Sequence, residues 1–143
     1  MKNLFFILLC LFLVSCGTPQ QRNSSISVNY EGSNVFRSNG LYCDEETLRN
    51  AVEGETRPLR IIFSRPDCPS CRKVHNFIKD RNVKGNILII NGKDAYAQFL
   101  MKELEITGVP VMFVLEAEKD DRILVGPMNI AMDLLDLATP SRL

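Results

Sequence analysis

The sequence predicts one α/β domain, a central mixed β-sheet flanked by helices. Two features of residues 41–143 support this fold class: short runs of β-branched and aromatic residues, typical of buried strands, and intervening segments whose apolar residues recur at helical spacing. Their order is helix, strand, helix, strand, helix, strand, strand, helix, which is a layered α/β design. The chain has 143 residues, 45% of them hydrophobic, enough for one modest core.

The N-terminus carries an export signal. Lys2 precedes an apolar run, residues 4–14, that is too short to anchor stably across a bilayer. The run ends Leu-Val-Ser-Cys-Gly at residues 13–17, which resembles the lipobox of bacterial lipoproteins. This resemblance implies that residues 1–15 are removed and that Cys16 is lipidated. The protein would then lie in the bacterial cell envelope, lipid-anchored to a membrane, with its domain facing the periplasm or the exterior. The alternative is an ordinary signal peptide that happens to contain a cysteine.

Residues 16–40 are predicted to tether the lipid to the domain. They are rich in Ser, Asn, Gln and Gly and show no sustained hydrophobic period. The folded domain is expected to span residues 41–143.

The domain begins with a predicted helix. Asp44 is a suitable N-cap, and Gly54 follows the expected end near Val52. Its core-facing residues would be Leu48 and Val52, joined by Leu41 just before the helix. Residues 60–64 then form the first predicted strand.

Residues 64–71, Ser-Arg-Pro-Asp-Cys-Pro-Ser-Cys, join this strand to a helix over residues 71–81. Two thiols three residues apart at a helix start lie about one turn from each other, so they can form a disulfide and separate again with little backbone change. Cys68 lies where free N–H groups and the helix dipole favour a thiolate. This pattern suits thiol–disulfide exchange, with Cys68 as the outer nucleophile and Cys71 as the inner resolving thiol.

The remaining elements follow in order. Residues 87–90 form a second buried strand, and Asp94 caps a helix over residues 95–104 whose inward residues are expected to be Phe99, Leu100 and Leu104. Residues 111–115 form the third strand. After a charged turn at residues 116–121, residues 122–125 pair back antiparallel and end at Gly126-Pro127. The final helix is marked by Ile130, Leu134, Leu135 and Leu137.

Residues 41–143 resemble the thioredoxin-like superfamily, which includes thioredoxins and glutaredoxins. The resemblance rests on the strand leading into Cys68-Pro69-Ser70-Cys71, the Gly108-Val109-Pro110 step about forty residues later, and Leu124-Val125-Gly126 before a helix. It implies a cis Val109–Pro110 bond beside the disulfide. The Val109 backbone would then dock an extended substrate peptide, and Pro110 would shape the site.

The sequence departs from thioredoxins at three places: Asp67 stands where they have tryptophan, Pro69-Ser70 where they have Gly-Pro, and Ile62 where they have a buried acid. The predicted activity is a lipid-anchored thiol–disulfide oxidoreductase that needs no cofactor. Its partners would be cysteine-containing exported proteins and a redox partner protein. Lys+Arg and Asp+Glu both number 17, so no basic surface suggests nucleic acid.

Two alternatives stay open. The first is a metal-binding module that uses Cys43, Cys68, Cys71 and His75, all ligands that Zn²⁺ or Cu⁺ accepts. The second is a tethered, non-catalytic binding domain on the same scaffold. In the favoured interpretation no metal is bound, Cys43 is a buried inert cysteine, and His75 occupies a solvated helix position.

Overall fold

The computed structural model describes residues 42–138. The predicted signal peptide, the lipidation site Cys16, the tether and the core position Leu41 lie outside these residues. The elements in chain order are α2 (Glu45–Glu53), β1 (Leu59–Ser64), α3 (Pro69–Asp80), β2 (Ile87–Asn91), α4 (Ala95–Glu103), β3 (Val111–Leu115), β4 (Arg122–Val125) and α5 (Pro127–Leu135). None of these helices is long and apolar enough to cross a membrane.

The strands form one mixed sheet in the order β2-β1-β3-β4. β1 pairs with β2 in parallel, and β1 with β3 and β3 with β4 antiparallel. Phe63 on β1 lies opposite Val111 on β3, so the end of β1 and the start of β3 meet at one edge of the sheet. Residues 64–71 and 108–110, the segments predicted to form the site, therefore lie close together at this edge.

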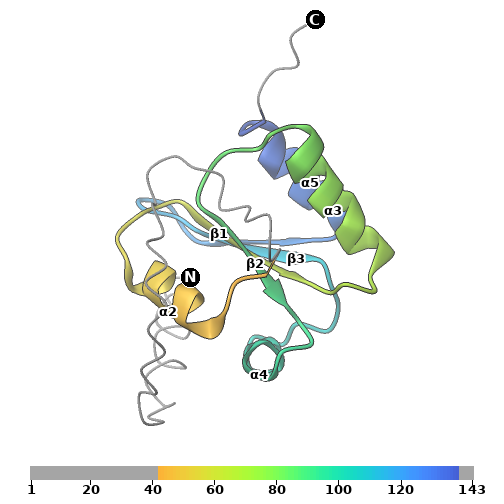
Figure 1. Cartoon of the computed structure of the whole chain (residues 1–143). Helices are drawn as coiled ribbons and strands as arrows, with labels where there is room; N and C mark the ends of the chain where they lie inside the picture. Colours follow the sequence, from red (N-terminus) through yellow and green to blue (C-terminus); the bar gives the residue numbers. More distant parts are fainter. Residues whose placement is uncertain (1–41, 139–143) are drawn as a thin grey trace, which may run out of the picture.

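Helices cover both faces of the sheet, with α2 and α4 on one side and α3 and α5 on the other (Figure 1). Both faces of β1 are covered, so all six of its residues are buried, which explains its nearly continuous apolar sequence. Ile61 and Phe63 face α2 and α4, while Ile62 faces α3 and α5. This is the predicted thioredoxin-like α/β fold.

The predicted helix boundaries hold to within a few residues. Asp44 caps α2 through a hydrogen bond from the Thr47 N–H to Asp44 Oδ1 at 2.8 Å, and Gly54 ends this helix. α3 begins at Pro69, and α5 begins at Pro127, directly after β4. Proline suits this first position because its missing N–H would have no partner in the helix.

One predicted core position is wrong. Phe99 on α4 is 48% exposed, and the helix instead buries Ala97, Leu100 and Met101. Leu135 on α5 is 51% exposed, whereas Ile130 and Leu134 are fully buried. In α4 and α5 the core-facing stripe does not include Phe99 and Leu135, whose side chains therefore face outward.

A buried ion pair ties α5 to the sheet. Arg60, on the α5 side of β1, donates from Nε to Asp133 Oδ2 at 2.8 Å. Arg122 at the start of β4 donates to the other carboxylate oxygen at 2.7 Å. One carboxylate on α5 thus joins a central strand and an edge strand.

Candidate active site

Cys68 is the N-cap residue of α3 and caps the helix with its own sulfur. Its backbone is extended, with φ −103° and ψ 111°, and the Cys71 N–H donates to Cys68 Sγ at 3.1 Å. Pro69 follows at the first helical position. A sulfur that accepts a backbone N–H at a helix N-terminus is stabilised as a thiolate once the pair is reduced.

The two cysteines differ in exposure. Cys68 and Cys71 are joined as a disulfide with their Cα atoms 5.2 Å apart. Cys68 is half-buried, and Cys71 is fully buried. An incoming sulfur therefore reaches Cys68 more easily, which is the predicted arrangement of an outer and an inner cysteine.

The Val109–Pro110 step lies beside this pair. The bond is cis, as the resemblance implies, and Cys68 Sγ lies 3.7 Å from Val109 O. Pro110 is buried, and its carbonyl accepts from the Gly126 N–H at 3.0 Å, which holds the step against the end of β4. Because proline has no N–H, residue 110 brings no backbone donor toward the sulfur atoms.

A groove of about 470 Å³ adjoins the Val109–Pro110 step on the α4 side of the sheet. Among residues 42–138 no helix covers β4 on that side, and Ile123 and Val125 are 50% and 62% exposed. This groove has no local signal in the sequence, although the alternation of β4 shows which of its residues share a face. The apolar residues that line it are Leu104, Ile106, Val109, Pro110, Val111, Phe113, Ile123, Val125 and Pro127.

His75 is not at the solvated position that was expected. It is half-buried on α3, and its Nε2 lies 2.8 Å from the Oγ of Ser64, which is fully buried at the end of β1. The Tyr42 ring packs edge-on against it, with centroids 6.1 Å apart. Burial lowers the pKa of His75, so the ring is neutral at pH 7. Ser64 gives the reason for this placement: a buried hydroxyl at the end of β1 needs a polar partner.

The four candidate metal ligands are not brought together. Cys43 packs on the α2 and α4 side of the sheet, whereas His75 lies on the α3 side. Among residues 42–138 no three His, Cys, Asp or Glu side chains form a group that could hold a metal. The metal-binding alternative is therefore wrong for this set.

Cys43 itself is a poor nucleophile. It is half-buried, and burial followed by the nearby Asp44 carboxylate raises the pKa of its thiol to about 12. At neutral pH it stays protonated, which supports the inert interpretation. Its backbone carbonyl accepts from the Tyr96 hydroxyl at 2.8 Å.

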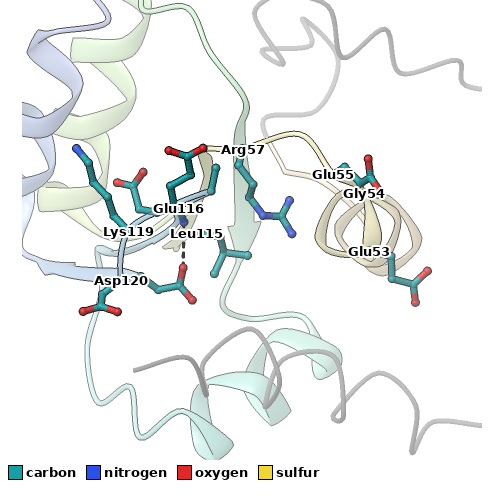
Figure 2. A pocket seen from close by; sticks show the side chains of 11 residues that line it. Glu53, Gly54, Glu55, Arg57, Leu115, Glu116, Lys119 and Asp120 are labelled. Atoms are coloured by element: carbon teal, nitrogen blue, oxygen red, sulfur yellow. Dashed lines mark hydrogen bonds between the residues drawn. The ribbon is translucent and has the colours of Figure 1, made fainter.

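A second hollow, of about 760 Å³, lies between the end of α2 and the β3–β4 turn (Figure 2). Its lining is mostly acidic, and Arg57 donates from there to Val52 O at 2.8 Å. Leu115, the last residue of β3, also lines it, so it lies at the opposite end of this strand from Pro110. It is separate from the cysteine site.

Comparison with known proteins agrees with this architecture. The glutaredoxin family model matches residues 61–116, a range that includes both cysteines and Pro110. No curated protein gives a significant match to the sequence. Chloroplastic thioredoxin z is a similar solved structure, with 18% identity and a TM-score of 0.48, covering 67% of this chain and 91% of its own.

The C-terminal domain of DsbD from Neisseria meningitidis is also similar. Its oxidised form has 20% identity and a TM-score of 0.47, covering 67% of this chain and 95% of its own. Its reduced form has 20% identity and a TM-score of 0.44, covering 67% and 98%. The family-model match over residues 61–116 fits the thioredoxin-like fold described above, and the adjacent cysteine pair is suited to thiol–disulfide exchange.

Proposed function

We propose that this protein is a lipid-anchored thiol–disulfide oxidoreductase that exchanges disulfides with exported proteins through Cys68 and Cys71. The observation that carries the proposal is the asymmetry of the pair. Cys68 Sγ is half-buried and accepts the Cys71 N–H at 3.1 Å, while Cys71 is fully buried. A structural disulfide needs neither a thiolate-stabilising donor nor a neighbouring groove.

In the reducing direction the Cys68 thiolate attacks one sulfur of a substrate disulfide. A Cys68–substrate bond forms, and the second substrate sulfur leaves as a thiolate. Cys71 then loses its proton, and its sulfur attacks Cys68 Sγ. The Cys68–Cys71 disulfide forms, the substrate leaves with both sulfurs reduced, and two electrons have passed from the protein to the substrate. The opposite direction reverses these steps, and a redox partner protein resets the pair.

The substrate peptide docks beside Val109 and Pro110. Val109 is half-buried and lies at the mouth of the apolar groove, and its carbonyl oxygen is 3.7 Å from Cys68 Sγ. An extended peptide laid along residue 109 would bring its own sulfur to Cys68 and its apolar side chains to Ile123 and Val125.

The anchor is the lipid on Cys16, which holds the domain at a membrane of the bacterial cell envelope, in the periplasm or at the exterior. This part of the proposal is supported by the apolar run that ends Leu-Val-Ser-Cys. Labelling with a lipid precursor should tag the parent protein, and Cys16→Ala should remove the tag. A soluble parent that keeps an unmodified Cys16 would contradict the anchor.

The activity is tested by turnover of a disulfide substrate with dithiothreitol as the reductant. The parent should turn over repeatedly, and Cys68→Ser should not. A parent whose disulfide persists and that shows no turnover would instead be a binding domain with a structural disulfide.

A further inference from the structure

The outward side of α5 presents a stripe of large apolar side chains. Met128, Met132 and Leu135 are 72%, 65% and 51% exposed. They recur at i, i+4 and i+7, so they lie on one side of the helix, while Ile130 and Leu134 on the opposite side are fully buried. A soluble surface rarely keeps such a stripe without an occupant.

The neighbouring helix adds positive charge to the same face. α3 packs beside α5 on one side of the sheet (Figure 1). Its outward residues and those just after it are mostly basic: Arg72, Lys73, Lys79, Arg81 and Lys84, with Asp80 among them and Asp136 at the end of α5. An apolar stripe flanked by Lys and Arg is the combination that binds an anionic lipid surface.

The described chain begins beside the edge strand β2, where the Cys43 N–H donates to Ile89 O at 2.8 Å. Tyr42, the first described residue, packs against the α3 and α5 cluster and contacts His75. Residues 17–41 join it to Cys16 and, at about 3.3 Å per residue, reach up to about 85 Å when extended. A tether of this kind makes docking to the same membrane intramolecular, so even a weak surface is occupied.

We infer that the outward face of α3 and α5 rests on the anionic headgroup surface of the membrane that holds the lipid. This inference rests on the proposed lipid anchor at Cys16. A second copy of the chain fits the face less well, because a two-fold contact would place one basic α3 near another. The groove beside Pro110 lies on the α4 side of the sheet, so docking leaves it open to substrate.

The absence of tryptophan from the sequence allows a direct test. Met132→Trp places a single fluorophore on the stripe, and Phe99→Trp places one on α4, on the opposite side of the sheet, where the native side chain is 48% exposed. Each full-length lipidated variant is reconstituted into vesicles of phosphatidylcholine and phosphatidylglycerol whose acyl chains carry bromine near the headgroup. Met128→Trp serves as a second reporter should the first fold poorly.

The inference predicts that the Met132→Trp variant loses about half of its emission or more to the brominated lipid, while the Phe99→Trp variant is little changed. Adding Arg72→Gln and Lys79→Gln to Met132→Trp, or raising the salt, should reduce this quenching. Equal quenching of both reporters, or none of either, would overturn the inference. A stripe fluorophore that is shielded from acrylamide but unquenched by lipid would also overturn it, in favour of a protein partner or second copy.

Lipidation of Cys16 is checked separately, from the mass of the N-terminal peptide. Failure of the oxidoreductase activity is read by turnover of the same preparations. An unlipidated Met132→Trp protein that is still quenched by added vesicles supports the docking face without the anchor, and quenching that appears only in the lipidated protein supports docking through the tether.

Discussion

Lys93 Nζ lies 3.0 Å from Asp67 Oδ2, which brings a cation to the residue just before the candidate nucleophile Cys68. The turn that carries Lys93 is held to the end of β1 by a hydrogen bond from the Gly92 N–H to Ser64 O at 2.7 Å. The hydrogen bond from Lys93 is the main cause that lowers the pKa of Asp67. Lys93 therefore offsets a negative charge that would disfavour a thiolate at Cys68.

Lys93→Gln should make Cys68 ionise less readily. In the reduced protein, the rate at which iodoacetamide alkylates Cys68 is measured against pH. We expect this rate to rise at higher pH in Lys93→Gln than in the parent. Both groups are exposed and screened by water, so the change in rate at neutral pH should stay below about fivefold. Asp67→Asn should shift the profile the other way. The double variant should match Asp67→Asn alone, and an additive double variant would rule out the pairing.

The resolving step is predicted to need Cys71. In Cys71→Ser the mixed disulfide between Cys68 and a substrate cannot be resolved, so covalent adducts should accumulate and disappear on reduction. Cys43→Ser is the matched control and should behave like the parent, since the Cys43 thiol stays protonated at neutral pH. Two double variants identify the attacking cysteine. If adducts persist in Cys68→Ser/Cys71→Ser but are lost in Cys43→Ser/Cys71→Ser, Cys43 is the nucleophile.

Much of the fold could be predicted because the strands are short, apolar and clearly separated. The cap at Asp44 and the break at Gly54 also marked their helix correctly. The exposure of Phe99 could not be predicted in the same way, because α4 is short and carries apolar residues on several sides. Which of them face the core depends on how the helix lies on the sheet. Arg60 and Asp133 are 73 positions apart in the chain, so no local sequence pattern predicts their ion pair.

Asp133→Asn should destabilise the protein. Arg60 and Asp133 side chains are 9% and 10% exposed, so removing the carboxylate charge leaves a buried guanidinium without compensation. We expect a loss of about 3 kcal/mol in the free energy of unfolding, measured by urea denaturation at pH 7. Asp136→Asn, at the exposed residue just after the same helix, is the control and should change stability by less than about 0.5 kcal/mol. Equal effects of the two variants would refute the structural role of the pair.

Stability should also fall with pH below about 6.5 because of His75. Burial lowers the pKa of His75 in the folded protein, so the unfolded chain takes up the proton first. The neutral ring therefore contributes its full stability above the unfolded pKa, and this contribution is lost as the pH falls through the lower folded value. His75→Gln keeps a polar partner for Ser64 Oγ and cannot titrate.

The measurement is the urea midpoint from pH 8 to pH 5. The parent should lose more stability than His75→Gln over this range. Parallel curves for the two proteins would show that His75 does not titrate in a buried setting.

The candidate site was predictable in its chemistry and less so in its surroundings. Cys68, Cys71 and Pro110 lie in local sequence motifs, so the resemblance to the thioredoxin-like superfamily predicted that they would lie close together. Lys93 and the groove residues Ile123 and Val125 come to the site from a turn and an edge strand, and His75 reaches Ser64 from the face of α3. Their positions depend on tertiary packing, for which the sequence offers no short-range signal. Ser64 was the one available clue to His75, as a hydroxyl at the end of a buried strand.

The central claim is that the Cys68–Cys71 disulfide is redox-active, and an equilibrium titration of the folded protein in glutathione or dithiothreitol buffers tests it most directly. The claim predicts one transition in which both cysteines gain and lose their thiols together. Its two-electron slope should be about 30 mV for each tenfold change in the ratio of reduced to oxidised pair. A disulfide that stays intact in all buffers until the protein is unfolded would contradict the claim.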